Sequence, residues 1–581
     1  MAARGRGERP VAVMQRRWGI ERLRWRADMR APVPAALARP AAPEGFGDPA
    51  RGRDLLAGRH LRAGQQVEGR GRTIWSLGPE ADPETATQHR FGWLDDLAAL
   101  GGAASRDLAW VWLMDWIGRY GDGRGPGWSP EAVAERLTRW LSNSAWVCQS
   151  PSPLADEAAF LRSLSMQSRW LARHWHRAGD EAGRIAALAA LLQVETALFG
   201  APRHAARRAA ALGQAAASAI GPGGDVASRD PEALLELFCA LAAAAVILGQ
   251  ATALAQRDAM TRAARTLRAL RHADGGLARF HGGGRGTEGR LERALAEAGG
   301  AAGPSPFDLR MGFARLASAR ITVLLDAAPP PRGADAARAH ASTLAFEMTC
   351  GRRPLIVSCG SGTHHGPDWR RAGRATPSHS TLCLDGHSSA RLGRGAGGSE
   401  PLVDGPREVL AHRADSDGLQ RIEASHDAWR AAFGLTHDRR LGLDRGGLTL
   451  VGEDLLTTLG PADERAFDAA SHAGRDPGVA FTIRFHLHPD VEPALDAQGA
   501  VALLRLRSGE VWRLAHDGGA RLSLAPSVYL EKSRPRPVPT QQVVLSGRAM
   551  AYATLVRWSL VRSGDAALAP RDLWRGEGDP A

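Results

Sequence analysis

Lysine is almost absent from this chain: Lys532 is the only one among 74 basic residues, so the net charge of +12 rests on arginine. Such a bias is most simply the codon bias of a GC-rich genome, and acidic residues are interleaved with the arginines. A nucleic-acid surface would gather its basic residues on one face or in one tract, so we expect no nucleic-acid partner. A basic balance does suit an anionic polysaccharide or oligosaccharide, which a positive field attracts.

Three further scarcities exclude other classes of protein. The five cysteines are odd in number and form no CxxC pair, which predicts free thiols rather than a disulfide framework. No apolar run reaches about 18 residues without a charge, so we predict no membrane span. Residues 1–30 lack the continuous apolar stretch and the cleavage site of a secretory signal, which favours the cytoplasm.

The first 300 residues carry apolar side chains at three- and four-residue spacing, which predicts helices. Ser129-Pro130-Glu131 and Asp230-Pro231-Glu232 each place a capping side chain before a first-turn proline, as helix starts do. Repeated antiparallel helix pairs over this length indicate an (α/α) toroid or incomplete barrel. The predicted helices cover 94–100, 110–117, 130–141, 155–178, 181–199, 205–220, 232–249 and 251–271.

Beyond about residue 317 the segments are short, β-branched or alternating, and Gly, Pro and Asp turns separate them. This is the pattern of an antiparallel β-sandwich. The predicted strands cover 321–325, 344–348, 355–357, 381–384, 448–451, 480–487, 501–506, 521–524 and 542–545. We therefore predict an α+β chain of several domains: a basic arm at 1–45, a helical toroid at 46–305 and a sandwich at 306–570.

Two histidine motifs lie about forty residues apart on predicted strands. They are His340–Glu347 (HASTLAFE) and Ser378–Gly386 (SHSTLCLDG), and between them runs the apolar strand Pro354–Gly360 (PLIVSCG). In order and spacing they resemble the C-terminal half of the heparinase II/III family of polysaccharide lyases. The helical-then-β architecture, which follows from periodicity alone, is also the architecture of that family.

The resemblance implies a carbon–oxygen lyase that cleaves beside a uronic acid by β-elimination, and a location in the cell envelope or periplasm. Such an enzyme must neutralise the uronate, remove its C5 proton and protonate the leaving oxygen. The family positions imply His340 as a catalytic residue. They also imply a metal set of His340, Ser358 and His379, with Ser358 standing where zinc-bearing relatives have an aspartate.

Two imidazoles and a hydroxyl form a poor Zn²⁺ set, so the sequence predicts no certain cofactor. Structural histidines at a domain interface, and direct catalytic or binding use, remain as alternatives. In the helical half the catalytic candidates are Arg229, as a bidentate clamp for a carboxylate, and His272, as a proton donor in place of the missing tyrosine. His281, on the other side of the turn Gly275-Gly276, is a candidate for substrate binding. For Arg229 the alternative is a capping loop, and for the histidines a helix C-cap.

His89-Arg90-Phe91-Gly92-Trp93 resembles an early toroid motif, which makes His89, Arg90 and Trp93 candidates for sugar binding; aromatic packing explains the motif equally well. The chain departs from the family in its tyrosines. Only Tyr120, Tyr529 and Tyr552 occur, and none lies at 200–300, where the lyases place their acid. The second hypothesis is therefore a catalytically impaired protein that binds envelope polysaccharide on the same scaffold.

Overall fold

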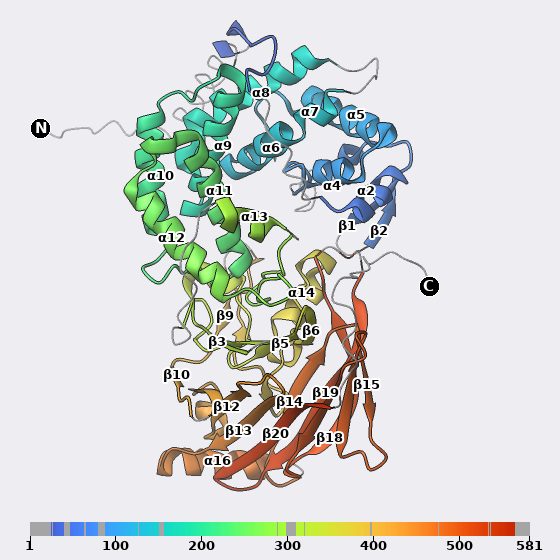
Figure 1. Ribbon diagram of the computed structural model, residues 1–581, viewed down its shortest axis with the longest axis vertical. Coiled ribbons are helices and arrows are strands. Elements are labelled where there is room, and N and C mark those ends of the chain that lie inside the picture. Colours follow the sequence, from blue (N-terminus) through green and yellow to red (C-terminus); the bar gives the residue numbers. More distant parts are fainter. Residues whose placement is uncertain are drawn as a thin grey trace, which may run out of the picture. The chain divides into compact units, whose positions relative to one another are not determined.

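The chain folds into helices followed by antiparallel sheets, which confirms the predicted fold class. The computed structural model describes residues 25, 27–28, 30–39, 47–62, 65–78, 87–125, 127–149, 156–287, 289–297, 309–318, 320–395, 398–416, 418–474, 476–532, 534 and 536–563. Most of the predicted basic arm at 1–45 lies outside them. In Figure 1 the helices run from blue to green and the strands of the sandwich from yellow to red.

By internal packing the chain divides into two units. The first comprises 1–219 and 237–260, and the second comprises 220–236 and 261–581. Helices α11 (Pro231–Leu248) and α12 (Leu254–Ala269) have residues in both units. The predicted boundary lay near residue 305. In the structure, residues 220–236 and 261–305, which flank the segment 237–260, belong to the same unit as the strands.

The first unit is built on amphipathic helices around an aromatic core. α6 begins where predicted, since Ser129 accepts a hydrogen bond from the Ala132 N–H and Pro130 occupies the first turn. Trp110, Trp116 and Trp140 are among its largest fully buried side chains. Its main helices are α2 (Pro49–Leu56), α4 (Gly92–Leu100), α5 (Ala103–Tyr120), α6 (Pro130–Ser142), α8 (Glu157–His174), α9 (Glu181–Phe199) and α10 (Ala205–Ala219), beside the hairpin β1 (Arg59–Arg62) and β2 (Gln65–Glu68).

Two helices, α9 and the stretch Pro231–Ala251, are long and apolar enough to cross a membrane. Core helices of proteins outside membranes have the same length and composition, and 67% of the relevant window of α9 is buried. This is weak evidence for a span, so the predicted absence of one stays a prediction.

In the described part of the second unit the strands form two antiparallel sheets of eight strands each and a short pair, β8 (Arg391–Leu392) and β9 (Leu402–Val403). The first, called the outer sheet below, has the order β10 (Val409–Arg413), β11 (Leu419–His426), β12 (Thr436–Asp444), β13 (Thr449–Thr457), β20 (Ala553–Ser563), β17 (Val511–His516), β16 (Val501–Leu506) and β15 (Val491–Leu495). The second, the inner sheet, has the order β18 (Arg521–Tyr529), β19 (Val538–Ala549), β14 (Val479–Leu487), β6 (Arg353–Val357), β5 (Phe346–Cys350), β4 (Ile321–Asp326) and β3 (Phe313–Ser318), and β7 (Leu382–Leu384) also pairs with β14.

One hydrophobic core lies within this unit and draws on strands of both sheets. Phe346 and Phe485 of the inner sheet and Trp512 and Trp558 of the outer sheet belong to it. All five cysteines are free, as the sequence predicts.

Candidate functional site

The predicted histidines gather at one edge of the inner sheet. Asp326 ends β4, His340 precedes β5, Ser358 follows β6 and His379 precedes β7. Neighbouring antiparallel strands begin and end at the same edge of a sheet, so the connections bring these side chains together.

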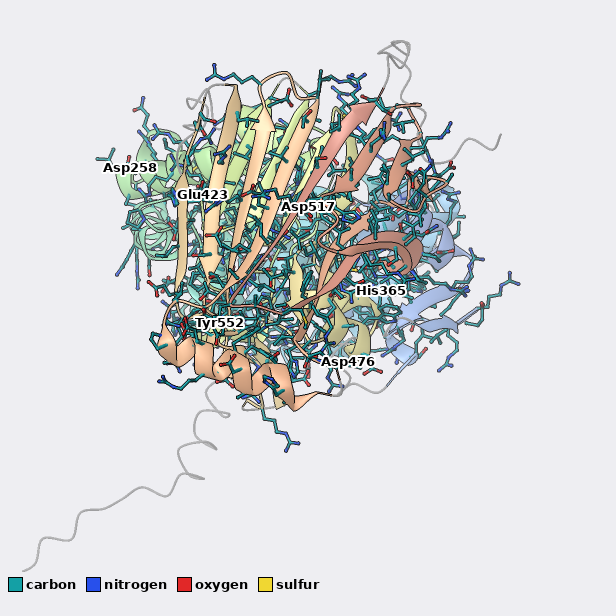
Figure 2. All side chains as sticks on the ribbon, turned by 90° about the horizontal axis from the view of Figure 1, so that it is seen from below. Asp258, His365, Glu423, Asp476, Asp517 and Tyr552 are labelled. Atoms are coloured by element: carbon teal, nitrogen blue, oxygen red, sulfur yellow. The ribbon has the colours of Figure 1, made fainter. Side chains whose placement is uncertain are left out.

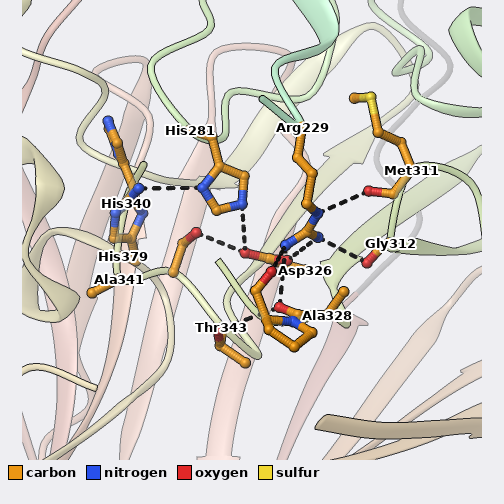
Figure 3. Close-up of polar contacts among 12 residues, drawn as sticks. Arg229, His281, Met311, Gly312, Asp326, Ala328, His340, Ala341, Thr343 and His379 are labelled. Carbon is orange, nitrogen blue, oxygen red and sulfur yellow. Dashed lines mark hydrogen bonds and ion pairs between the residues drawn. The ribbon is translucent and has the colours of Figure 1, made fainter. Parts of the chain in front are cut away.

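Asp326 lies at the centre of this cluster (Figure 3). Its carboxylate accepts hydrogen bonds from Arg229 Nη2 at 2.5 Å and from Ser342 Oγ at 2.7 Å, and His281 Nε2 lies 3.3 Å from Oδ2. Burial alone would raise the pKa of Asp326, but the charge of Arg229 and the contacts of His281 and Ser342 lower this pKa well below its ordinary value. Asp326 is therefore a fixed buried anion.

The guanidinium of Arg229 forms its hydrogen bonds within the protein. Besides Asp326 it donates to four backbone carbonyls, at 2.7 to 3.1 Å, and its backbone is left-handed with φ of 52°. These carbonyls belong to Met311, Gly312, Ala328 and Pro329. The predicted role as a carboxylate clamp needs free donors, so the geometry favours a positioning role instead.

His281 links this anion to His340. The backbone N–H of His340 donates to His281 Nδ1 at 3.2 Å, so the hydrogen of the neutral imidazole is on Nε2, facing Asp326 (Figure 3). Burial lowers the pKa of His281, and Asp326 opposes that shift. Predicted as a substrate-binding residue, His281 instead fixes the backbone of a predicted catalytic one.

The rings of His340 and His379 are neighbours, with centroids 5.3 Å apart and planes inclined by 56°. His379 Nδ1 hydrogen-bonds Ser358 Oγ at 3.1 Å. Among the described residues, His340 Nδ1 and His379 Nε2 are buried with no hydrogen-bond partner of normal geometry. Burial lowers the pKa of His379 to about 3 and that of His340 well below 6.5, to which the neighbouring imidazole adds. Both rings are therefore neutral at pH 7 and able to accept a proton.

The predicted metal set of His340, Ser358 and His379 does not fit a zinc ion. Ser358 Oγ bonds the Nδ1 side of the His379 ring, whereas the unpartnered nitrogen is Nε2 on the other side. No group of three His, Cys, Asp or Glu side chains able to hold a metal occurs in the described part of the chain. A structural or catalytic zinc site needs at least three such ligands, so these residues are better described as an imidazole pair than as a metal site.

His272 belongs to a second cluster, around the buried carboxylate of Glu347. His272 Nε2 lies 3.2 Å from Glu347 Oε2, and the backbone N–H of Arg279 donates to the same oxygen at 3.0 Å. Beside them is a cavity of about 20 Å³, room for about one water. Ser358 joins the two clusters, because its N–H donates to Glu347 at 3.4 Å while its hydroxyl contacts His379.

Tyr529 of β18 also lines this cavity, and sequence reasoning missed it. The guanidinium of Arg279 lies over its ring at 4.1 Å, and its hydroxyl donates to Glu531. Burial raises the pKa of Tyr529 above its ordinary value, so the phenol stays protonated. No local signal marks Tyr529, which comes from a strand far along the chain. Glu347 could have been found, because it closes the HASTLAFE motif.

His89, Arg90 and Trp93 lie in the first unit. His89 is fully buried and accepts a hydrogen bond from Trp116 Nε1 at 2.9 Å, and Trp93 is 6% exposed among other rings. Arg90 pairs with Glu135. Sugar binding by these residues stays a prediction, and their burial favours the alternative of aromatic packing.

Comparison with known proteins gives a consistent result. Residues 302–559 match the family model described as heparinase II/III-like, C-terminal. The chain is 31% identical over 577 residues to FtsZ-localized protein C of Caulobacter vibrioides, covering 95% of this chain and 94% of that protein.

Solved structures of polysaccharide lyases share the fold. Heparinase III matches with a TM-score of 0.62 at 12% identity, covering 94% of this chain and 89% of its own. The heparan sulfate lyase HepC from Pedobacter heparinus matches with a TM-score of 0.51 at 15% identity, covering 94% of this chain and 88% of its own.

Proposed function

Because the chain belongs to the heparinase II/III-like family, we propose that it cleaves a uronic-acid-containing anionic polysaccharide of the cell envelope by β-elimination. The observation that carries this proposal is the imidazole pair: two neutral rings, 5.3 Å apart, each with a buried nitrogen that no described residue occupies. A general base for a carbon acid must be unprotonated at the working pH and free of competing hydrogen bonds. His340 meets both conditions, whereas the ring of His379 already bonds Ser358 and contacts the backbone of Gly373.

In the proposed reaction His340 removes the C5 proton of the uronate. The electron pair of that C–H bond forms the C4–C5 double bond, and the C4–O bond to the next sugar breaks. The leaving oxygen takes a proton from the Glu347 cluster, where His272 and Tyr529 carry exchangeable hydrogens. Arg229 acts at a distance, because it holds Asp326, which faces His281, which in turn holds the backbone of His340.

The test follows the ultraviolet absorbance of the conjugated product during incubation with heparan sulfate, alginate and bacterial exopolysaccharide. Replacing a general base typically slows a reaction by about 10²–10⁴-fold, so we expect a loss of that size in His340→Ala. His412→Ala removes an exposed histidine of β10 and should retain full activity. Equal rates in the His340→Ala variant and the unsubstituted protein would remove His340 from the mechanism.

A second candidate function is binding without cleavage. His340 and His379 are 2% and 0% exposed, so a polymer reaches them only if the surrounding segments open. The Arg229 donors are bonded to Asp326 and to backbone carbonyls, so they do not face a substrate. A relative covering nearly the whole chain is named for localisation with FtsZ, which supports a non-catalytic protein of the division-site envelope. A flat absorbance trace from folded protein, together with a fluorescent fusion that follows FtsZ in cells, would favour this candidate over the lyase.

A further inference from the structure

The exposed face of the outer sheet carries a groove that the histidine clusters do not use. It has a volume of about 580 Å³, within the range of ligand pockets. Its lining comes from β11, β12, β13, β20 and β17. Figure 2 views the molecule toward this face, with Glu423 and Asp517 labelled over its strands.

Small side chains form the floor of the groove. Gly442, Val451, Ser559 and Ala515 pair directly across four adjacent strands, so they make one row running across the sheet. Arg421 of β11 pairs with Gly442 and ends this row. Five strands at about 4.8 Å spacing span roughly 19 Å, so the hollow is long and narrow and follows the row.

A ladder of alternating charges borders the floor on one side. Glu423, Arg440, Glu453 and Arg557 occupy the next outward row, on β11, β12, β13 and β20. Arg440 pairs loosely, at 3.6 Å from Glu423 and 3.4 Å from Glu453, while Arg557 donates a hydrogen bond to Glu453 at 3.1 Å. Exposed pairs of this kind contribute little stability, so a ligand can replace them at small cost.

Arg421 is different from the arginines of the ladder. Its backbone N–H donates to Asp415, but its guanidinium has no ion-pair or hydrogen-bond partner among the described residues. It lines the groove as an uncompensated cation with five donors in a planar fork, the geometry that receives a carboxylate or sulfate bidentately.

The groove offers no face of a tryptophan, tyrosine or phenylalanine. Trp558, the single such residue of its lining, is 3% exposed and packs under Gly452 on the core side, which leaves the imidazole of His516 as the only other ring in the lining. Single-stranded nucleic acids bind largely by stacking bases on rings, and extended peptides add to the edges of sheets rather than to their faces. The surface therefore lacks what those two ligand classes use.

We propose that this groove is a second binding site for an acidic oligosaccharide, separate from the histidine clusters. Sugar hydroxyls both donate and accept hydrogen bonds, so one edge of the chain can be held by the carboxylates and guanidiniums of the ladder. A carboxylate or sulfate of the glycan pairs with Arg421, and the small floor residues admit the rings. The site anchors polymer without taking part in cleavage, and it stands whether or not the chain is a lyase.

The test is calorimetric titration of the full chain with length-matched oligosaccharides of heparan sulfate, of alginate and of uncharged dextran. The background is the His340→Ala variant, so that cleavage does not consume the probe. We expect Arg421→Glu, which reverses the free charge, and Ser559→Trp, which fills the floor, each to weaken binding of the acidic probes at least tenfold. Arg505→Glu makes the same charge change on the same face of β16, outside the groove, and should alter affinity less than twofold.

Circular dichroism and thermal unfolding establish that each variant is folded, and Arg421→Gln provides a milder second variant at the same position. Unchanged affinity in folded Arg421→Glu and Ser559→Trp would overturn the proposal. So would equal binding of dextran, or of a polyglutamate peptide, because the surface would then not select an acidic glycan. The lyase assay on the unsubstituted background is a separate readout, and a failure there leaves the groove result intact.

Discussion

Asp326 contacts more side chains of the candidate site than any histidine does, because Arg229, Ser342 and His281 all face its carboxylate. We expect Asp326→Asn to lower the free energy of unfolding by about 3–5 kcal/mol, since it leaves the Arg229 cation without its buried counter-charge. Urea unfolding followed by circular dichroism measures the loss.

The matched control is Asp404→Asn. Asp404 pairs with Arg391 at the surface, its side chain is 58% exposed, and its φ of 52° is one that asparagine tolerates. An exposed pair is worth about 0–1 kcal/mol, so this variant should remain close to the unsubstituted protein. Similar losses in both variants would show that Asp326 is not the buried counter-charge of Arg229.

The sequence singled out His281, His340 and His379, which lie together, but it also placed His272 with them, whereas His272 contacts Glu347 instead. His340 and His379 come from the two motifs that resemble the family, and His281 follows the turn Gly275-Gly276; all three lie in one cluster. Asp326 directly follows the predicted strand 321–325 and carries no motif of its own. Its partners lie 16 to 97 residues away in the chain, and such long-range contacts leave no local pattern.

The strands β12, β13 and β20 meet around a buried ion pair. Arg439 donates two hydrogen bonds to Asp454, and also reaches the carbonyls of Leu344 and Ser380 beside the histidine motifs. Trp558 Nε1 donates to the same Asp454 at 2.9 Å. The core of the outer sheet is thus tied to the edge of the inner sheet that carries the site.

Gly452 is the position at which this arrangement admits no side chain. A Cβ there would lie 2.1 Å from the Trp558 ring, so Gly452→Ala must displace the indole that bonds Asp454. We expect a loss of about 1–3 kcal/mol in the free energy of unfolding, as for other overpacked cores. Urea titration of the full chain gives the value.

Gly474→Ala provides the comparison. At the end of α16 (Pro461–Ala473) a Cβ would make only ordinary contact, 3.6 Å from the Asp476 carbonyl, and φ is −93°. This variant should unfold within about 0.5 kcal/mol of the parent. If Gly452→Ala were equally harmless, the outer sheet would have to relax more freely than its packing indicates.

Sequence periodicity predicted the long helices from α4 to α12, apart from the four-residue α7, and several strands of the inner sheet, but it missed β10, β11, β12, β15, β17 and β20 of the outer sheet. Predicted helix 130–141 is α6, Pro130–Ser142, and predicted strand 480–487 is β14, Val479–Leu487. By contrast, β12 points His437 and Arg439 into the core, where Asp454 satisfies both. Because the inward side chains of β12 include polar and charged ones, its sequence does not alternate apolar with polar residues. Only the contacts across the strands show that this face is buried.

Across both units, buried histidines couple stability to pH. Burial lowers the pKa of eight of them, so the folded protein holds them neutral while the unfolded chain protonates them near pH 6.5. Unfolding then takes up protons, and stability present above pH 6.5 is lost as the pH falls toward the folded pKa values, by up to about 1.4 kcal/mol per pH unit for each histidine. They are His60, His89, His281, His340, His379, His426, His437 and His488.

Two buried aspartates act in the opposite direction. Burial raises the pKa of Asp96 and Asp230 to about 6, so both bind protons in the folded state and stabilise it as the pH falls below that value. The histidines outnumber them, and we expect the urea midpoint to fall between about pH 7 and pH 5. A midpoint that is constant or rises over this interval would contradict the assignment of neutral buried imidazoles.

The second unit includes residues 220–236 and 261–301 besides the strands. A fragment without these segments tests whether the strands need them. Residues 302–563 span the family-model match and the last described strand. They lack Arg229 and His281, which face Asp326, and His272 and the Arg279 N–H, which face Glu347. We expect the fragment to lose its near-ultraviolet circular dichroism and cooperative unfolding, because two buried carboxylates have lost their partners.

The same substitution should then have opposite signs in the two contexts. In the full chain Asp326→Asn leaves Arg229 without its counter-charge and destabilises the fold. In the fragment the same substitution removes an unpaired carboxylate, so the substituted fragment should recover part of its near-ultraviolet circular dichroism. Glu347→Gln should behave likewise, since its partners His272 and Arg279 are also absent. A fragment that unfolds cooperatively at the midpoint of the full chain, and that either substitution weakens, would mean that the strands satisfy these carboxylates by themselves and that 220–236 and 261–301 only attach to a finished sandwich.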